Sequence, residues 1–223
     1  MFTAQDKDFL SRKMSMDVGF IESKLQESSI KEYNSDAVDL ISSYISMVKG
    51  INVTGKLLNP ISVTVAFNEI FISTISKISQ NNKTEIYKVL DSIRHAFCSF
   101  ATGGLVALYT QQEYEDWYPK IKINEIIEPN DISSLPEKFI IYRGCDVSEL
   151  NSKVFGQSWS TSPGIAEMFA YKQYKNEAWF NIKNRIVLTA EYTRDDVFYS
   201  SCRSEFEVVV NIHKLKNVKR HNN

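Results

Sequence analysis

The segment Phe139-Ile140-Ile141-Tyr142-Arg143-Gly144-Cys145 decides the fold, because it is a short apolar run of β-forming residues directly after Pro136. Similar runs, separated by polar turns, follow at 158–161, 185–192 and 205–212. Between two of them, 163–174 has the pattern of one short helix. We therefore expect a largely antiparallel sheet in this half of the chain.

The first half is predicted to be helical. From Ser35, a good N-cap, apolar residues recur at helical spacing as far as Gly50, where we expect the helix to end. A second helix is predicted from Asn59-Pro60 to about residue 79, a third after a loop and cap at 81–84, and a further one over 105–117. The third should end at Gly103-Gly104. The prediction is an α+β fold, with a helical region over 1–125 and a β-rich core over 126–223; whether the halves share one core is left open.

Composition excludes several classes of protein. The 223 residues carry a net charge of −1, so the overall field favours neither nucleic acid nor a membrane. Three scattered cysteines, at positions 98, 145 and 202, argue against a disulfide framework and a zinc site, and we expect no metal. The start of the chain lacks the pattern of a signal peptide, and its most apolar segment, 58–75, is broken by Asn68 and Glu69. We expect a cytoplasmic protein.

Three short motifs carry the candidate chemistry, each at a predicted strand. Tyr142-Arg143-Gly144 closes the first strand, Ser160-Thr161-Ser162 closes the second, and Glu205-Phe206-Glu207 opens the last. Arg143 precedes Ser160 by 17 residues, and Glu207 follows Ser160 after another 47. Each motif alone is common in proteins, and what is informative is their order and their shared strand context.

In this order the motifs resemble the Arg, Ser-Thr-Ser and Glu-x-Glu signature of ADP-ribosyltransferases related to cholera-type and clostridial binary toxins. Ala166, Phe169 and Ala170 also follow the second motif as in that family, and the strand at 185–192 matches the one before its substrate loop. The resemblance covers about a third of the chain. It implies an NAD-consuming enzyme with N-terminal helices packed on a largely antiparallel β-sandwich of ADP-ribosyltransferase type.

The resemblance assigns roles that the chemistry itself requires. Cleavage of the nicotinamide–ribose bond leaves an oxocarbenium-like centre, which Glu207 would stabilise while binding the ribose 2′-hydroxyl. Arg143 would hold the NAD diphosphate through its forked donors. Ser160 would orient Glu207 by a hydrogen bond. The remaining expected NAD contacts are the backbone of Gly144 near the nicotinamide amide, the Ser160-Thr161-Ser162 segment, and a ring to stack on nicotinamide from among Phe169, Tyr171 and Tyr174.

The acceptor side is expected just before the last motif. On a strand, Glu205 and Glu207 would face the same side with Phe206 on the other, and Glu205 would then orient the acceptor. In the family a glutamate at this place accompanies arginine acceptors. The loop 194–204 would recognise the acceptor, with Phe198 and Tyr199 as exposed aromatic candidates for a protein or a nucleobase.

The favoured hypothesis is a cytoplasmic mono-ADP-ribosyltransferase that modifies a protein, RNA or DNA. The lack of an export signal resembles intracellular toxins of toxin–antitoxin or phage-defence systems, which need a neutralising antitoxin or chaperone; the helical region is a candidate docking surface for it. Two alternatives remain open: an NAD glycohydrolase using the same residues, and a binding module that has lost turnover. For single motifs the structural interpretation also stands, since Ser160 and Ser162 are typical helix caps and Phe169 is typical of a core.

Overall fold

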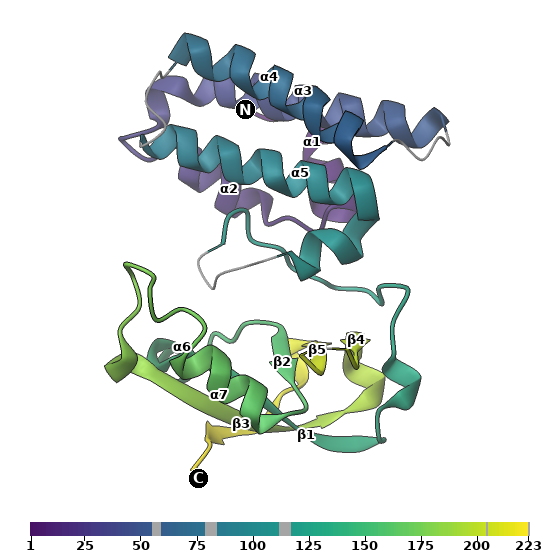
Figure 1. Cartoon of the computed structure of the whole chain (residues 1–223), viewed down its shortest axis with the longest axis vertical. Coiled ribbons are helices and arrows are strands. Elements are labelled where there is room, and N and C mark those ends of the chain that lie inside the picture. Colours follow the sequence, from purple (N-terminus) through teal and green to yellow (C-terminus); the bar gives the residue numbers. More distant parts are fainter. Residues whose placement is uncertain (55–58, 79–83, 112–116, 204, 223) are drawn as a thin grey trace. The chain divides into compact units, whose positions relative to one another are not determined.

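The computed structural model describes residues 1–54, 59–78, 84–111, 117–203 and 205–222, with only the backbone for 52–54. The chain divides into two compact units, Met1–Lys122 and Ile123–Asn223 (Figure 1). The first is helical, and every strand of the described residues lies in the second.

The helical unit begins with short elements and continues with three long helices. Its elements are α1 (Ala4–Asp8), η1 (Phe9–Lys13), α2 (Val18–Leu25), η2 (Lys31–Tyr33), α3 (Asn34–Thr54), α4 (Pro60–Ile78) and α5 (Glu85–Thr110). The long helices meet at three buried rings: the centroid of Tyr44 lies 4.9 Å from that of Phe67 and 5.4 Å from that of Phe97. Each ring comes from a different long helix, so this cluster holds α3, α4 and α5 together.

The three predicted long helices are confirmed, with corrections at their ends. Gly50 does not end α3, because it keeps a φ in the helical range, whereas a C-terminal glycine stop uses a positive φ. The predicted stop at Gly103-Gly104 is confirmed: α5 consists of two helices that meet at a kink, where Gly104 has the non-helical values φ 66° and ψ −156°. The predicted loop at 81–83 and the last part of the helix predicted over 105–117 lie outside the described residues.

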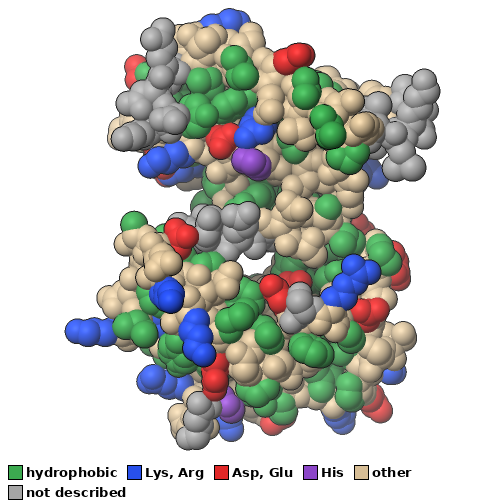
Figure 2. All heavy atoms as spheres, in the orientation of Figure 1, with side chains coloured by type: hydrophobic (Ala, Val, Ile, Leu, Met, Phe, Trp, Pro, Cys, Tyr) green, Lys and Arg blue, Asp and Glu red, His purple; other side chains and the backbone are tan. Residues whose placement is uncertain are grey.

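Helix α4 has one buried face and one exposed apolar face. Val63, Phe67, Phe71 and Ile75 recur every four residues and are buried. On the outer face Ile61, Val65 and Ile72 are exposed, and Figure 2 shows hydrophobic side chains at the surface of this unit. By length and composition alone α4 could cross a membrane. However, α4 also has a regular buried face that packs against α3 and α5, and such a face is typical of a surface helix in a folded helical bundle.

The second unit is built on one open sheet. Its strands are β1 (Lys138–Asp146), β2 (Ser158–Ser160), β3 (Arg185–Thr193), β4 (Val197–Ser201), β5 (Glu207–Val210) and β6 (Lys216–Arg220), in the order β4-β5-β2-β1-β3-β6 with every pair antiparallel. Helices α6 (Val147–Ser152) and α7 (Pro163–Tyr171) and the short turns η3 (Ile132–Ser134), η4 (Ile182–Asn184), η5 (Arg194–Asp196) and η6 (Ile212–Lys214) connect them. The predicted α+β class with an antiparallel sheet is confirmed. All described strands belong to this one sheet, so the sandwich stays a prediction.

The two faces of this sheet carry different layers. On one face a core surrounds Ile141, Trp159 and Leu188. On the other face α7 packs through Ala166 and Ala170. Gly144 makes this close approach possible: a Cβ there would lie 3.1 Å from Ala170 Cα and would overlap the backbone of Ala166 and Ala170 still more severely. Alternation along the strand then assigns Tyr142 and Gly144 to the α7 face and Arg143 to the opposite one.

Candidate functional site

The three sequence motifs lie on three neighbouring strands. Ser160 on β2 is directly opposite Tyr142 on β1 and also directly opposite Glu207 on β5. Residues opposite each other in antiparallel strands point to the same face. Tyr142, Ser160 and Glu207 therefore form a row across the middle of the sheet, on the face that α7 covers. The sheet thus brings together residues that are up to 65 positions apart in the sequence.

The carboxyl group of Glu207 is held by a serine that the sequence argument did not single out. Ser158 Oγ donates a hydrogen bond of 2.7 Å to Glu207 Oε1. Burial raises the pKa of Glu207 to about 7; the Ser158 hydrogen bond opposes this shift, and the negative charge of Glu205 adds to it. The prediction that Ser160 donates this hydrogen bond is corrected to Ser158, two residues earlier on the same face of β2.

Ser160 binds the turn before β5 instead. Its Oγ donates to the backbone oxygen of Glu205 at 2.8 Å and accepts from the backbone N–H of Ser162 at 3.0 Å. Thr161 N–H donates to the backbone oxygen of Phe206 at 3.0 Å. The Ser160-Thr161-Ser162 motif therefore fixes the backbone of the turn that carries Glu205 and leads into Glu207. Ser162 is also the N-cap residue of α7.

Arg143 forms a partly buried ion pair with Glu149 on α6. Its Nε and Nη2 donate to the two carboxylate oxygens at 2.9 and 2.7 Å, and Nη1 donates to the backbone oxygen of Ser158 at 2.7 Å. Gly156 N–H gives Glu149 a third hydrogen bond of 3.0 Å. Burial would raise the pKa of Glu149, but the charge and hydrogen bonds of Arg143 outweigh burial and leave that pKa below its ordinary value. The guanidinium donors of Arg143, which the sequence predicts to bind the NAD diphosphate, thus bind the carboxylate of Glu149 in the structure.

The position of Gly144 has a structural explanation. Its missing side chain leaves room for α7, because a Cβ at this position would overlap the backbone of Ala166 and Ala170. Gly144 thus has a packing role, and the contact of its backbone with the nicotinamide amide stays a prediction.

The candidate stacking aromatics after the second motif form a cluster of their own. Phe169 lies 6.0 Å from Tyr174, and Tyr174 lies 5.3 Å from Trp179, measured between ring centroids. The Arg185 guanidinium lies over the Trp179 ring, with Cζ 5.9 Å from the ring centroid. Tyr171 packs against the small core under α7. Phe169 and Tyr171 are half-buried and Tyr174 is buried, so the structural interpretation noted for Phe169 fits the contacts of all three.

The predicted acceptor loop contains a strand. Phe198 and Tyr199 belong to β4, which pairs with β5, and Tyr199 is buried with 7% of its surface exposed. The prediction that both rings are exposed is wrong for Tyr199, and Phe198 is half-buried. Strand pairing explains this, because alternate residues of β4 point into the unit. Ser204, the last residue of the predicted loop, lies outside the described residues.

The third motif is a turn followed by a strand, rather than a continuous strand. Strand β5 begins at Glu207, and Phe206 just before it has a φ of 48°. Glu205 is exposed, and its charge acts on Glu207. The prediction that both glutamates alternate along one strand is therefore wrong in its geometry, although the two carboxylates do influence each other. Phe206 is the exposed aromatic of this region, with 47% of its surface accessible.

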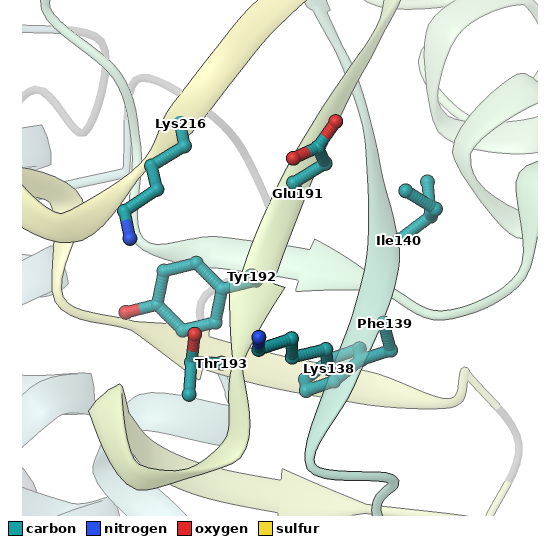
Figure 3. A pocket seen from close by; sticks show the side chains of 7 residues that line it. All are labelled: Lys138, Phe139, Ile140, Glu191, Tyr192, Thr193 and Lys216. Carbon is teal, nitrogen blue, oxygen red and sulfur yellow. The ribbon is translucent and has the colours of Figure 1, made fainter.

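The described residues offer no metal site and a further pocket. Within the described ranges, no group of three or more His, Cys, Asp or Glu side chains is arranged to hold a metal ion. A pocket whose lining contains none of the motif residues lies beside β1, β3 and β6 (Figure 3). It is lined by Lys138, Phe139, Ile140, Glu191, Tyr192, Thr193 and Lys216.

The comparisons with known proteins find no similarity that bears on this site. No protein-family model matches the chain, and neither a curated protein nor a solved structure matches it.

Proposed function

We propose that this chain is a mono-ADP-ribosyltransferase that cleaves NAD and transfers ADP-ribose to a cytosolic macromolecule. The observation that carries the proposal is the row Tyr142, Ser160 and Glu207 across three adjacent strands. Three motifs chosen from sequence order alone become neighbours in space. Their meeting on three adjacent strands of one sheet supports the proposal.

The proposed reaction breaks the bond between ribose C1″ and the nicotinamide nitrogen, and the bonding electron pair leaves with nicotinamide. Ionised Glu207 binds the ribose 2′-hydroxyl and stabilises the positive charge that develops on the ribose. A lone pair of the acceptor then forms the new bond to C1″, and the acceptor proton passes to Glu205 or to water. Glu205 suits this second role because it is exposed and lies beside Glu207.

The other motif residues support Glu207 through the backbone. Ser160 and Thr161 hold the turn of Glu205 and Phe206 by hydrogen bonds of 2.8 and 3.0 Å. Arg143 anchors β2 through Ser158 and is paired with Glu149. A diphosphate would compete with Glu149 for the same forked donors, so NAD binding through Arg143 requires that carboxylate to yield.

The acceptor is an arginine-type protein side chain or a nucleic acid. Glu205 and the exposed Phe206 ring offer a negative charge beside an aromatic face, and a planar guanidinium is attracted to both. Such an enzyme acting inside its own cell is a toxin, which requires a neutralising partner; the exposed apolar side chains of α4 are available for that contact.

Incubation of the purified chain with NAD labelled in its adenylate part, together with cell extract, tests this function. Protein and nucleic acid are separated afterwards, and Glu207→Gln is run beside the wild type. Label that enters either fraction only with the wild type supports the transferase and gives its acceptor class. Loss of NAD without labelled macromolecule would instead identify a glycohydrolase, and intact NAD would leave only a binding module.

A further inference from the structure

Ser158 lies between the two charged residues of the site and contacts both. Its backbone oxygen accepts a 2.7 Å hydrogen bond from Arg143 Nη1, and its hydroxyl donates a 2.7 Å hydrogen bond to Glu207 Oε1. We propose that Ser158 is the positioning residue that aims the Glu207 carboxylate at the substrate ribose. This inference rests on the proposed function, and it assigns to Ser158 the orienting role that the sequence motif suggests for Ser160.

The backbone around Ser158 is fixed from several directions, as a positioning residue requires. Next to it, the Gln157 side chain donates to the backbone oxygen of Ile123 at 2.6 Å and accepts from the N–H of the same residue at 2.8 Å. Val210 N–H donates to the backbone oxygen of Gln157 at 2.9 Å. On the other side, the Trp159 indole N–H donates to the backbone oxygen of Gly156 at 2.9 Å. Ser158 is thus a rigid platform between β1 and β5.

Ser160 is not equivalent, because its hydroxyl is already engaged. Its single proton is donated to the backbone oxygen of Glu205, and its oxygen accepts from Ser162 N–H. A hydroxyl has one proton to donate. Ser160 would therefore have to break its hydrogen bond to the backbone oxygen of Glu205 before it could donate to the Glu207 carboxylate. Both serines face the same side of β2, and the structure divides two tasks between them: Ser160 holds the turn and Ser158 holds the carboxylate.

The hydrogen bond from Ser158 has two physical consequences. It restricts rotation of the carboxyl group about its last side-chain torsion, which is otherwise broad. It also favours the ionised form, because a hydroxyl donates more strongly to a carboxylate than to a neutral acid. Loss of the hydroxyl should therefore misalign Glu207 and make its ionisation harder, while contacts elsewhere along the NAD molecule are left as they are.

The kinetic test compares Ser158→Ala, Ser158→Thr and Ser160→Ala with the wild type, using nicotinamide release from NAD. Ser158→Ala should lower kcat by about 10-fold or more with the KM for NAD changed by less than about threefold. The pH at which its rate is half-maximal should move upward. Ser158→Thr retains a hydroxyl on a β-favouring residue and should recover most of the rate. Equal kcat and an unshifted pH profile for Ser158→Ala and the wild type would overturn the proposal.

A second readout does not depend on turnover and separates failure of this inference from failure of the proposed function. The Glu207 carboxyl carbon is titrated by NMR in the wild type and in both alanine variants, with Glu207→Gln to assign the signal. The pKa should rise in Ser158→Ala by about half a unit or more and shift less in Ser160→Ala. An unchanged pKa in Ser158→Ala would refute the positioning role even in an active enzyme. A wild type without activity but with the expected shift would refute the transferase alone and leave Ser158 as the residue that controls Glu207.

Discussion

Gly156 lies against the guanidinium of Arg143, so that a Cβ at position 156 would come within 2.6 Å of Arg143 Cζ. The same guanidinium is held by Glu149, at 2.7 Å between Nη2 and Oε1. A Cβ at position 156 would therefore displace the guanidinium from the place it occupies in this ion pair. The absence of a side chain at Gly156 is therefore a condition for the Arg143–Glu149 pair.

Gly156→Ala should destabilise the second unit by about 2–4 kcal/mol, because the added methyl displaces a charged group from its hydrogen bonds. Urea unfolding measures the change in the free energy of unfolding. Gly164→Ala is the matched control, since a Cβ there would meet nothing closer than 3.9 Å. Equal stability of Gly156→Ala and the control would show that the ion pair tolerates displacement.

The Arg143–Glu149 pair should behave as a coupled unit. Arg143→Lys keeps the charge but cannot make the two-pronged contact, and Glu149→Gln keeps the shape but removes the charge. Since only 13% and 17% of the two side chains are exposed, each change should cost about 1–3 kcal/mol.

A double-mutant cycle on these two residues measures their coupling. We expect the double variant to lose at least about 1 kcal/mol less than the sum of the single variants. Additive losses would indicate that the ion pair contributes little and that each residue acts through other contacts.

Gly144→Ala tests the packing role of the third residue in the first motif. A Cβ would overlap the backbone of α7, which cannot move like a flexible side chain. We expect a loss of about 2–4 kcal/mol in urea unfolding, and separation of α7 from β1. Loss of NAD affinity at unchanged stability would favour the ligand-contact role predicted from the sequence.

Glu207 should make stability depend on pH in an unusual direction. Its pKa is about 7 in the folded chain against an ordinary value of 4.5. Between these values the folded chain keeps a proton that the unfolded chain has lost, so the contribution of this group to stability falls as pH rises from about 4.5 to about 7. Glutamine is neutral throughout, so Glu207→Gln should exceed the wild type in the free energy of unfolding by about 1–3 kcal/mol at pH 8.

The same comparison at pH 4.5 is the internal control, because the folded wild type is protonated there and the advantage of the glutamine variant should disappear. Urea unfolding at both pH values measures it. A difference between the two proteins that does not change with pH would show that Glu207 has an ordinary pKa.

Much of the fold could be predicted from the sequence. The long helices and strands β1 and β3 have clear periodic or β-rich patterns. Strand β6 could not be predicted, because Lys216, Lys219 and Arg220 are equally typical of a basic, solvated end of the chain. Charged residues of this kind are also what an edge strand carries on its exposed side, and the pattern alone does not separate the two. Strand β4 lies inside the predicted loop 194–204. Its burial does not alternate strictly, because its register shifts between Val197 and Tyr199.

The site could be predicted in its residues and less well in its contacts. The row of Tyr142, Ser160 and Glu207 follows from motif order once the strands pair in the observed register. Ser158 could have been found from alternation, since it shares a face with Ser160 on the same strand. Glu149 could not, because α6 has only six residues and no periodic signal. The turn at Phe206 depends on tertiary contacts with Thr161, which no local pattern reports.

Release of nicotinamide from NAD by the purified chain tests the central claim most directly, with Glu207→Gln and Glu191→Gln measured beside the wild type. Glu191 is a matched control, because it is an exposed glutamate on β3 of the same sheet. The account predicts release by the wild type, a rate within about twofold for Glu191→Gln, and a loss of at least about 100-fold for Glu207→Gln. Release that survives in Glu207→Gln, or a wild type that leaves NAD intact, would contradict it.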